Sequence, residues 1–221
     1  ESVAVVVVSD EKKARETLKK FGSDLKNEYR TPDSDVSLCV EPASPTVLPM
    51  TKADSEKVVT LLTCMPNGLI ELSMDIAGLP QTSLNLGILT TSENEVSASF
   101  CVRSSVSSQK EMLKKRLTRM TSLLGGSVSY FGEYPAWEFK SDSPILKLCA
   151  DVYEKKFGKK PVITAIHGGL ECGLFSEKMP GLDCVSFGPD IFDIHTPREK
   201  LSVSSLNRTW EFLLEVLKEM K

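Results

Sequence analysis

The sequence TSLNLGILT at residues 82–90, followed by TSEN at 91–94 and EVSASFCV at 95–102, decides the fold of the first part of the chain. The two longer runs are rich in apolar and β-branched residues and have the length of β-strands. The polar connection between them is short enough to reverse the chain direction. Together the three stretches predict an antiparallel hairpin.

Further strands and helices are expected on both sides of this hairpin. Runs of β-branched residues predict strands, and apolar residues at helical spacing behind a Ser or Asp cap predict helices. Residues 1–135 are therefore predicted to form an open two-layer α+β domain. Its expected strands are Val3–Val8, Val36–Val40 and Ser127–Phe131, and its expected helices begin at Ser9 or Asp10, at Asp54, and at Ser107 or Ser108, the last of them ending at Gly125 and Gly126.

Residues 136–221, which follow a linker around Tyr134–Trp137, show a different order of predicted elements. Helices and strands alternate there, which is typical of a parallel α/β sheet. Only two strands are expected, fewer than a stable α/β sheet needs, so further strands are expected upstream of residue 1. The chain also begins on a strand-like run without Met, which suggests a piece of a longer protein. The expected elements are helices at Pro144–Phe157, Gly169–Glu177 and Ser204–Met220 and strands at Val162–Ile166 and Cys184–Phe187.

The composition indicates a globular protein that acts on a small molecule or a protein partner. Apolar residues make up 41% and charged residues 26% of the 221 residues, and the net charge is −3. Acidic and basic residues are interspersed, so neither nucleic acid nor an anionic membrane is an expected partner. The six cysteines form no C-x-x-C pair, and the run Val3–Val8 is too short for a bilayer and lacks the basic start of a signal peptide. A cytoplasmic location is expected.

Two histidines, His167 and His195, follow the two strands predicted in the second part of the chain. The carboxyl ends of strands are the edge at which open α/β sheets bind ligands. A neutral imidazole in a loop is a good metal ligand, although each residue can equally be an ordinary loop histidine. Two imidazoles cannot hold a pair of metal ions, so a metal site here needs further ligands.

Three other positions are candidates for binding an anionic group. The pair Gly168 and Gly169 precedes a helix whose first turn holds Glu171, so its backbone N–H groups can face an anion, or the pair can simply permit close packing. Arg103 ends a strand, where its planar fork can hold a carboxylate or can simply be solvated. Asn85 is a polar residue within a strand, and most such residues lie at edges.

The stretches IHGGLECGLF (166–175), VSFGP (185–189) and HTPRE (195–199) resemble the aminoacyl-histidine dipeptidase (peptidase D) family. The upstream stretches PNGLI (66–70), TSLNLG (82–87), CVRS (101–104) and GEYPAW (132–137) resemble it too. The resemblance spans most of the chain. That family is similar to the co-catalytic zinc peptidases such as peptidase V, carnosinase and carboxypeptidase G.

The resemblance implies an α/β catalytic domain interrupted by an α+β lid that mediates homodimerisation. Residues 1–135 would be most of the lid, and residues 136–221 the last segment of the catalytic domain. Two zinc ions in the parent protein would activate water to hydrolyse a dipeptide of the Xaa-His type. The implied roles are a zinc ligand for His195, a grip on the dipeptide carboxylate for Arg103, substrate contact for Asn85, a cleft lining for Gly168 and Gly169, and a place near substrate or metal for His167 and Glu171.

The chain also departs from that family in what it lacks. The remaining metal ligands, the general-base glutamate and a lid histidine all precede residue 1 in the family. No catalytic residue is therefore expected within this chain, and the chain alone is expected to be inactive. Two alternatives stay open: a non-catalytic dimerisation or interaction module, and a related N-acyl amino acid deacylase or carboxypeptidase. No residue indicates a preference for a carboxy-terminal histidine.

Overall fold

A computed structural model describes residues 2–44 and 48–220 of the chain, which forms two compact units, Glu1–Val59 and Thr60–Lys221. The helix α2 (Lys52–Cys64) passes from the first unit into the second, and it matches the helix expected from Asp54. Of the helices that the structure describes, none combines the length and the apolar character that crossing a membrane requires.

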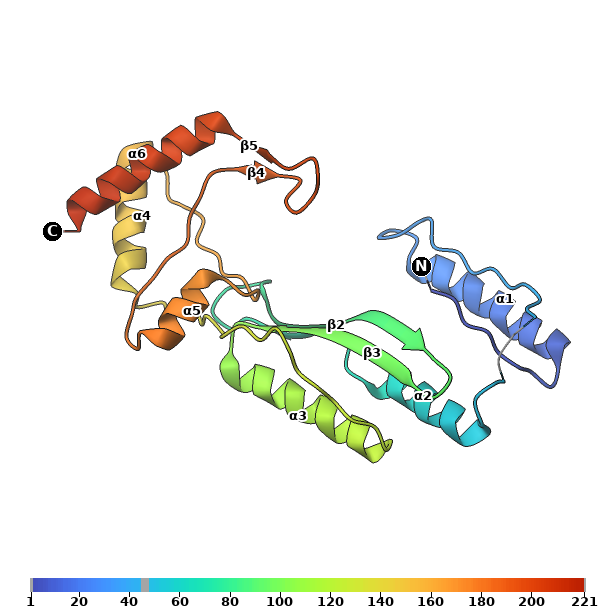
Figure 1. Ribbon diagram of the computed structural model, residues 1–221. Coiled ribbons are helices and arrows are strands. Elements are labelled where there is room, and N and C mark those ends of the chain that lie inside the picture. Colours follow the sequence, from blue (N-terminus) through green and yellow to red (C-terminus); the bar gives the residue numbers. More distant parts are fainter. Residues whose placement is uncertain (1, 45–47, 221) are drawn as a thin grey trace. The chain divides into compact units, whose positions relative to one another are not determined.

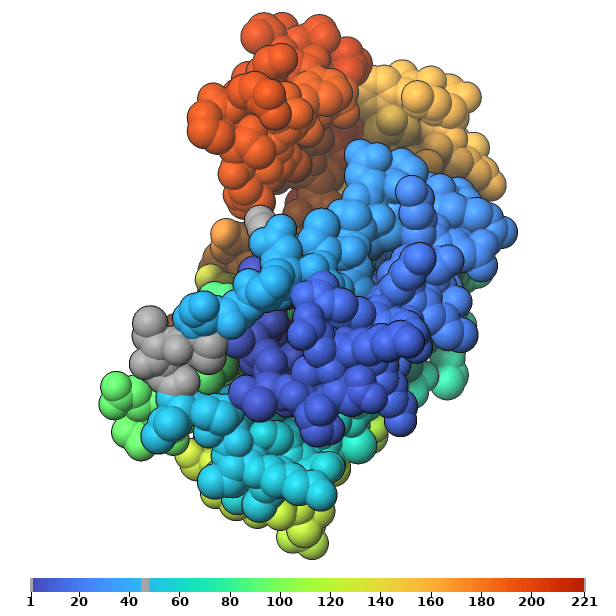
Figure 2. Space-filling model, turned by 90° about the vertical axis from the view of Figure 1, so that its right-hand side faces the viewer, coloured from blue at the N-terminus to red at the C-terminus, as the bar shows by residue number. Residues whose placement is uncertain are grey.

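The first unit is built around α1 (Glu11–Glu28), which begins where the sequence predicts. The Asp10 carboxylate accepts a hydrogen bond from the Lys13 backbone N–H at 2.9 Å, so it satisfies one of the free N–H groups at the start of the helix. An extended segment packs on the helix at Gly22, where an added Cβ would lie 3.3 Å from the Leu38 Cβ. In the space-filling view, the helix and the extended segments of this unit form one contiguous body (Figure 2).

The two strands predicted in this unit do not form. Val3–Val8 and Val36–Val40 are extended, but neither hydrogen-bonds to a neighbouring strand among the described residues. The side chain of Val3 is 85% exposed, and the other valines of its run are exposed as well. A run of β-branched residues favours extended backbone, but it becomes a strand only when another strand pairs with it.

The second unit contains the predicted hairpin within a three-stranded antiparallel sheet (Figure 1). The strands β1 (Gly68–Leu72), β2 (Pro80–Thr91) and β3 (Val96–Ser104) lie in that order, and the turn is closed by a hydrogen bond of 2.8 Å from the Ser92 N–H to the Glu95 carbonyl. The hairpin prediction is therefore confirmed.

One face of this sheet packs against α2 and α3 (Ser107–Leu123), which confirms the predicted two-layer arrangement. Leu84 from β2 is fully buried in one cluster with Met65, which directly follows α2, and Leu117 of α3. Because side chains alternate along a strand, the neighbours of Leu84 on β2 face the opposite side of the sheet. That opposite side is the open face of the sheet, and it carries the candidate residues described below.

The cap predicted for α3 is wrong by one or two residues. Val106 occupies the cap position, and its side chain cannot accept a hydrogen bond. The Glu138 carboxylate reaches in from outside the helix and accepts from the Ser107 N–H at 3.2 Å. The helix ends as expected before Gly125, whose φ of 81° lies in the left-handed region.

Residues 127–131 do not form the predicted strand but run back along α3. The Tyr130 hydroxyl donates to the Lys114 carbonyl at 2.6 Å, and the Lys114 ammonium pairs with Glu133 at 2.9 Å. Side-chain contacts with a helix therefore replace the strand pairing that the β-branched pattern suggested.

The three helices predicted in the last part of the chain are all confirmed. They are α4 (Pro144–Phe157), α5 (Glu171–Lys178) and α6 (Val203–Glu219). Helices α4 and α6 pack together through a buried cluster of Cys149, Val152, Phe212 and Val216. The ring of Phe212 makes an edge contact with the ring of Phe187, which holds the extended segment before the next hairpin against α6.

The two strands predicted in this part do not form, so the expected parallel sheet is not present among the described residues. Residues 162–166 and 184–187 are extended without a hydrogen-bonded neighbour strand. The strands that do form are the two-residue β4 (Ile191–Phe192) and β5 (Lys200–Leu201), an antiparallel pair that the sequence did not suggest. The domain boundary near residue 135 stays a prediction.

Candidate functional site

His195 lies in the loop between β4 and β5, and hydrogen bonds within this loop hold its backbone. The His195 N–H donates to the Glu199 carboxylate at 2.8 Å. The Thr196 hydroxyl donates to the Asp193 carbonyl at 2.8 Å and accepts from the Arg198 N–H at 3.2 Å. The loop backbone around the exposed imidazole is therefore fixed by its own hydrogen bonds.

The backbone of this loop is strained at two residues that are not glycine. Asp193 has a φ of 52° and His195 a φ of 65°, both in the left-handed region. Such conformations cost about 1–3 kcal/mol each and persist where the surroundings fix them, often at binding sites. The His195 ring has no hydrogen-bond partner among the described residues, so both of its nitrogens are open to a ligand.

The base of this hairpin is attached to the start of α6. Ser205, which is buried in the first turn of that helix, donates its hydroxyl to the Ser202 carbonyl and accepts from the Asp190 N–H, both at 2.8 Å. The Asp190 carbonyl accepts from the Ser202 N–H at 3.0 Å. The His195 loop thus projects from a helix that is itself anchored in the core cluster.

Arg103 and Asn85 both lie on the open face of the three-stranded sheet. Arg103 of β3 is directly opposite Ser83 of β2, and Asn85 is opposite Cys101, two residues along each strand. Since directly opposite residues share a face, these four side chains form one row away from the helices. Arg103 and Asn85 are exposed, and neither makes a hydrogen bond or ion pair through its side chain among the described residues.

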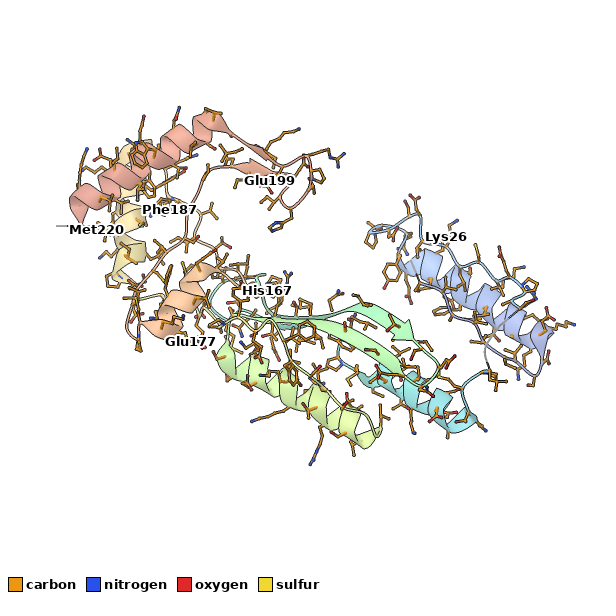
Figure 3. The ribbon with its side chains drawn as sticks, viewed as in Figure 1. Lys26, His167, Glu177, Phe187, Glu199 and Met220 are labelled. Carbon is orange, nitrogen blue, oxygen red and sulfur yellow. The ribbon has the colours of Figure 1, made fainter. Side chains whose placement is uncertain are left out.

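His167 reaches the same face from the loop that precedes α5, as Figure 3 shows. Its Nε2 lies 2.8 Å from the Ser83 hydroxyl oxygen, a contact between residues 84 positions apart. Partial burial, and secondly the positive charge of Arg103, lower the pKa of His167 below its ordinary value. Both effects favour the neutral form of the imidazole.

Gly168 and Gly169 continue this loop, and Gly169 permits a close approach of the chain. A Cβ at Gly169 would lie 2.6 Å from the Tyr134 ring, and one at Gly168 would meet only the Ile166 side chain at 3.6 Å. The packing that glycine allows is thus visible at Gly169. Glu171 begins α5 and is exposed.

The structure brings some of the predicted site residues together and leaves others apart. Arg103, Asn85 and His167 lie at the open face of the sheet, and Gly168 and Gly169 follow His167 in its loop, whereas His195 is held in its own hairpin. No hydrogen bond or ion pair links His195 to the other candidates within the described part of the chain. Nor do three His, Cys, Asp or Glu residues converge anywhere in residues 2–44 and 48–220. These residues alone therefore do not make a metal centre, and His195 would be a single ligand within one.

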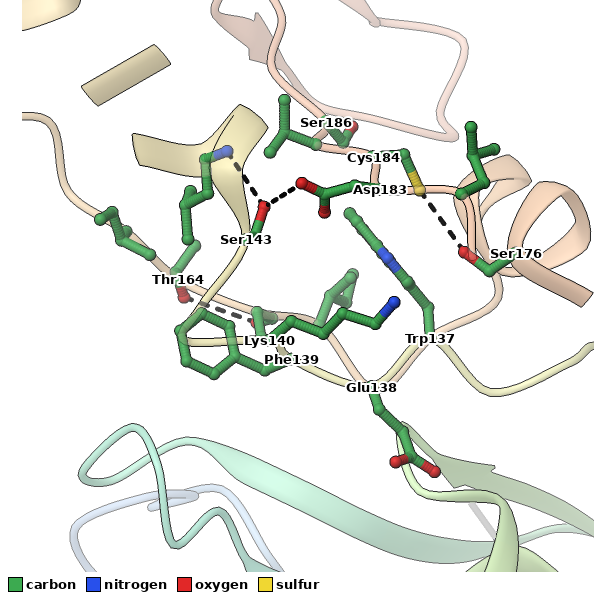
Figure 4. Close-up of a pocket in the computed structure, with 16 residues that line it drawn as sticks. Trp137, Glu138, Phe139, Lys140, Ser143, Thr164, Ser176, Asp183, Cys184 and Ser186 are labelled. Atoms are coloured by element: carbon green, nitrogen blue, oxygen red, sulfur yellow. Dashed lines mark hydrogen bonds between the residues drawn. The ribbon is translucent and has the colours of Figure 1, made fainter. Parts of the chain in front are cut away.

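A separate pocket of about 100 Å³ opens between residues 163–166 and 182–186 (Figure 4). Its polar edge is the Asp183 carboxylate, which accepts hydrogen bonds from the Ser143 hydroxyl at 2.9 Å and from the Ile145 N–H at 3.0 Å. None of the candidate residues above lines this pocket. It is a gap beside the two segments that were predicted to be strands.

Sequence reasoning missed Ser83, Thr196 and Glu199. Ser83 was detectable once the hairpin register was known, since that register places it opposite Arg103. Thr196 and Glu199 lie in the HTPRE stretch, but nothing in their spacing showed that they hold the loop through hydrogen bonds to Asp193 and His195.

Known proteins similar to this chain are peptidases. The chain is 34% identical over 196 residues to the cytosol non-specific dipeptidase of Escherichia coli, an alignment that covers 89% of this chain and 40% of that protein. The crystal structure of aminoacylhistidine dipeptidase from Vibrio alginolyticus matches with a TM-score of 0.85 and 34% identity, over 95% of this chain and 43% of that one. The chain therefore spans about 40% of the length of these relatives.

A more distant structure shares the fold alone. It is aminopeptidase PepT from Bacillus cereus, which matches with a TM-score of 0.57 and 20% identity over 75% of this chain and 44% of that one. The model of Peptidase family M20/M25/M40 matches residues 1–219. Since that match covers nearly the whole sequence, and since the similar proteins bear out the resemblance read from the HGGLE and HTPRE stretches, the chain belongs to peptidase family M20/M25/M40.

Proposed function

We propose that the protein containing this chain is a metal-dependent dipeptidase, and that this chain binds the free carboxylate of the dipeptide. The observation that carries the proposal is the contact between β2 and the loop before α5, beside the β3 residue Arg103. There the Ser83 hydroxyl contacts His167 at 2.8 Å, and Arg103 lies directly opposite Ser83 in the sheet. Relatives at 34% identity are named as dipeptidases, which supports this activity.

The chemistry of the open face suits a carboxylate. Arg103 is a permanent cation whose planar fork matches the two oxygens of a carboxylate, and its side chain has no acidic partner among the described residues. The Asn85 amide on the same face can donate a further hydrogen bond. Gly168 and Gly169 follow His167 in the same loop, where Gly168 would line the substrate cleft and Gly169 lets the loop pack closely on Tyr134, and Glu171 follows at the start of α5.

The proposed metal is a pair of zinc ions, of which this chain would supply one ligand, His195. The ring of His195 is exposed and free of hydrogen bonds, and its loop is held in a strained conformation, which suits a fixed ligand. The remaining ligands and the general base would come from outside this chain. Bound zinc supplies an activated water molecule. We therefore propose that the chain alone is inactive.

Hydrolysis assays on the full-length protein and on this chain test the proposal. We expect the full-length protein to cleave dipeptides, to lose that activity on dialysis against a chelator and to regain it with zinc, while this chain stays inactive. N-acyl amino acids should be poor substrates. Preferred cleavage of N-acyl amino acids would instead support the deacylase, and cleavage by the chain alone would contradict the placement of the missing groups.

A homodimer is a second part of the proposal. In the described residues β3 pairs only with β2, so its outer edge has free backbone N–H and C=O groups. Such an edge can pair with a second copy. Light scattering after size exclusion should report a dimer for the full-length protein, and a monomer at high concentration would argue against it. We also propose a cytoplasmic location, on the strength of the relative named as a cytosol dipeptidase.

A further inference from the structure

The hydrogen bond between Ser83 and His167 joins the sheet to the loop before α5. We propose that Ser83 is a positioning residue, which fixes the His167 imidazole in the tautomer protonated at Nδ1 and so provides a second, neutral donor beside Arg103. The inference rests on the proposed function for its substrate, but the geometry that carries it is the 2.8 Å contact between the Ser83 hydroxyl oxygen and Nε2.

The direction of this hydrogen bond follows from the number of protons available. A hydroxyl group has one proton, and Nε2 of His167 is the one protein acceptor in contact with the Ser83 hydroxyl among the described residues. If Nε2 carried the ring proton, the hydroxyl proton would have to turn away from its partner at a half-buried position. Donation from Ser83 to Nε2 uses that proton and leaves the ring proton on Nδ1.

The surroundings of the ring favour its neutral form, which donation from Ser83 to Nε2 requires. Partial burial and the Arg103 cation both lower the pKa of His167, so the ring is neutral and one nitrogen must accept. Arg103 is the charged side chain that acts on the ring, and Ser83, directly opposite it in the sheet, is the polar one. With Nε2 bound to Ser83, Nδ1–H has no protein acceptor in the described chain and is available to a ligand.

The consequence for the substrate is a carboxylate site with one cation and one neutral donor. Arg103 supplies the charge, and Nδ1–H of His167 supplies a hydrogen bond whose direction Ser83 fixes. At acid pH the ring gains a proton at Nε2, which then donates to the Ser83 oxygen, and a second positive charge appears beside Arg103. The His167 ring is therefore expected to orient the substrate carboxylate through one hydrogen bond, while Arg103 contributes most of the electrostatic attraction.

Nuclear magnetic resonance on histidine-labelled chain tests the tautomer directly. The chain has only two histidines, so a His195→Gln variant assigns both signals. The ¹⁵N shifts of His167 should show the Nδ1–H tautomer and a pKa below the ordinary value. In Ser83→Ala the pKa should rise and the Nε2–H tautomer should become dominant, whereas Ser83→Thr should retain the wild-type shifts.

A matched control is available on the same face of the sheet. Ser99 of β3 is exposed and makes no side-chain hydrogen bond within the described chain, so Ser99→Ala should leave the His167 signals unchanged. An Nε2–H tautomer in the wild-type chain overturns the proposal. So does a Ser83→Ala variant whose tautomer and pKa match the wild type.

Kinetics on the full-length protein separate this proposal from the dipeptidase proposal. Ser83→Ala should raise KM for dipeptides about three- to tenfold, the effect of one hydrogen bond, and lower kcat less. If the tautomer result holds but the full-length protein cleaves no dipeptide, the role of Ser83 stands and the proposed function falls. If dipeptides are cleaved and the tautomer is unaffected by Ser83→Ala, the reverse is true.

Discussion

Replacing Arg103 with alanine is the substitution that addresses the proposed carboxylate site most specifically. The side chain is exposed on the open face of the sheet and contributes no ion pair or hydrogen bond within the described chain, so its removal should leave the fold intact. A charge-assisted hydrogen bond contributes about 1.5–3 kcal/mol. Because the site is exposed and screened, we take about 2 kcal/mol, which corresponds to roughly a 30-fold loss in kcat/KM.

The assay compares dipeptides with their carboxy-terminal amides in the full-length protein. Arg103→Ala should raise KM for the free dipeptide and change the kinetics of the amide far less, because the amide has no carboxylate to lose. Arg119, an exposed arginine of α3, is a matched control, and Arg119→Ala should behave as the wild type. An equal loss on both substrates, or no loss on either, would refute the carboxylate role of Arg103.

Three further predictions concern the stability of the chain. Leu84→Ala removes a fully buried side chain and should lower the free energy of unfolding by about 2–5 kcal/mol, whereas Leu89→Ala, at a side chain that is 45% exposed, should change the urea midpoint little. Asp183→Ala removes two hydrogen bonds at the start of α4 and should lower the free energy of unfolding by about 1–3 kcal/mol. The control is Asp151→Ala, at an exposed position of the same helix. Equal thermal midpoints for the two variants would contradict the capping role of Asp183. The pKa of His167 is lower in the folded chain than in the unfolded chain, so the unfolded chain binds the imidazole proton more tightly. The stability that is present above the ordinary histidine pKa should therefore be lost as the pH falls through the pKa of His167 in the folded chain. In His167→Gln the urea midpoint should depend less on pH in this range. An unchanged pH dependence would contradict the prediction.

Helices were predictable from the sequence because their signals are local. The Asp10 side chain caps α1, and the Ser143 hydroxyl accepts from the Leu146 N–H at the start of α4, so each helix begins beside a residue that satisfies its free N–H groups. Helices α3 and α5 have no such side chain at the cap position, and at α3 the acceptor is Glu138, 31 residues away. Local spacing cannot reveal such a distant partner.

Strands were predictable only where their partners are close in sequence. The hairpin of β2 and β3 formed as expected because a short turn joins the two strands. Val3–Val8 and Val162–Ile166 have the composition of strands but no strand beside them in the described chain, so they stay extended. Their β-branched residues favour an extended backbone, but whether an extended segment pairs with another strand depends on the rest of the fold.

The places of the candidate residues in the fold were partly predictable, but their contacts were not. Arg103 and Asn85 are polar residues within strands, and the alternation of side chains along a strand explains why both lie on the open face. The contact between Ser83 and His167 depends on how a loop crosses the sheet, so no local pattern predicts it. The left-handed backbone of His195 was equally hidden, since that conformation is rare for a histidine.

The zinc content of the full-length protein, with and without the His195 imidazole, tests the central proposal most directly. We predict two zinc ions per chain in the wild-type protein by elemental analysis, and the loss of about one of them, together with most of the turnover, in His195→Ala. A His195→Ala protein that keeps its full metal content, or a wild-type protein that cleaves dipeptides without any bound metal, would contradict the account.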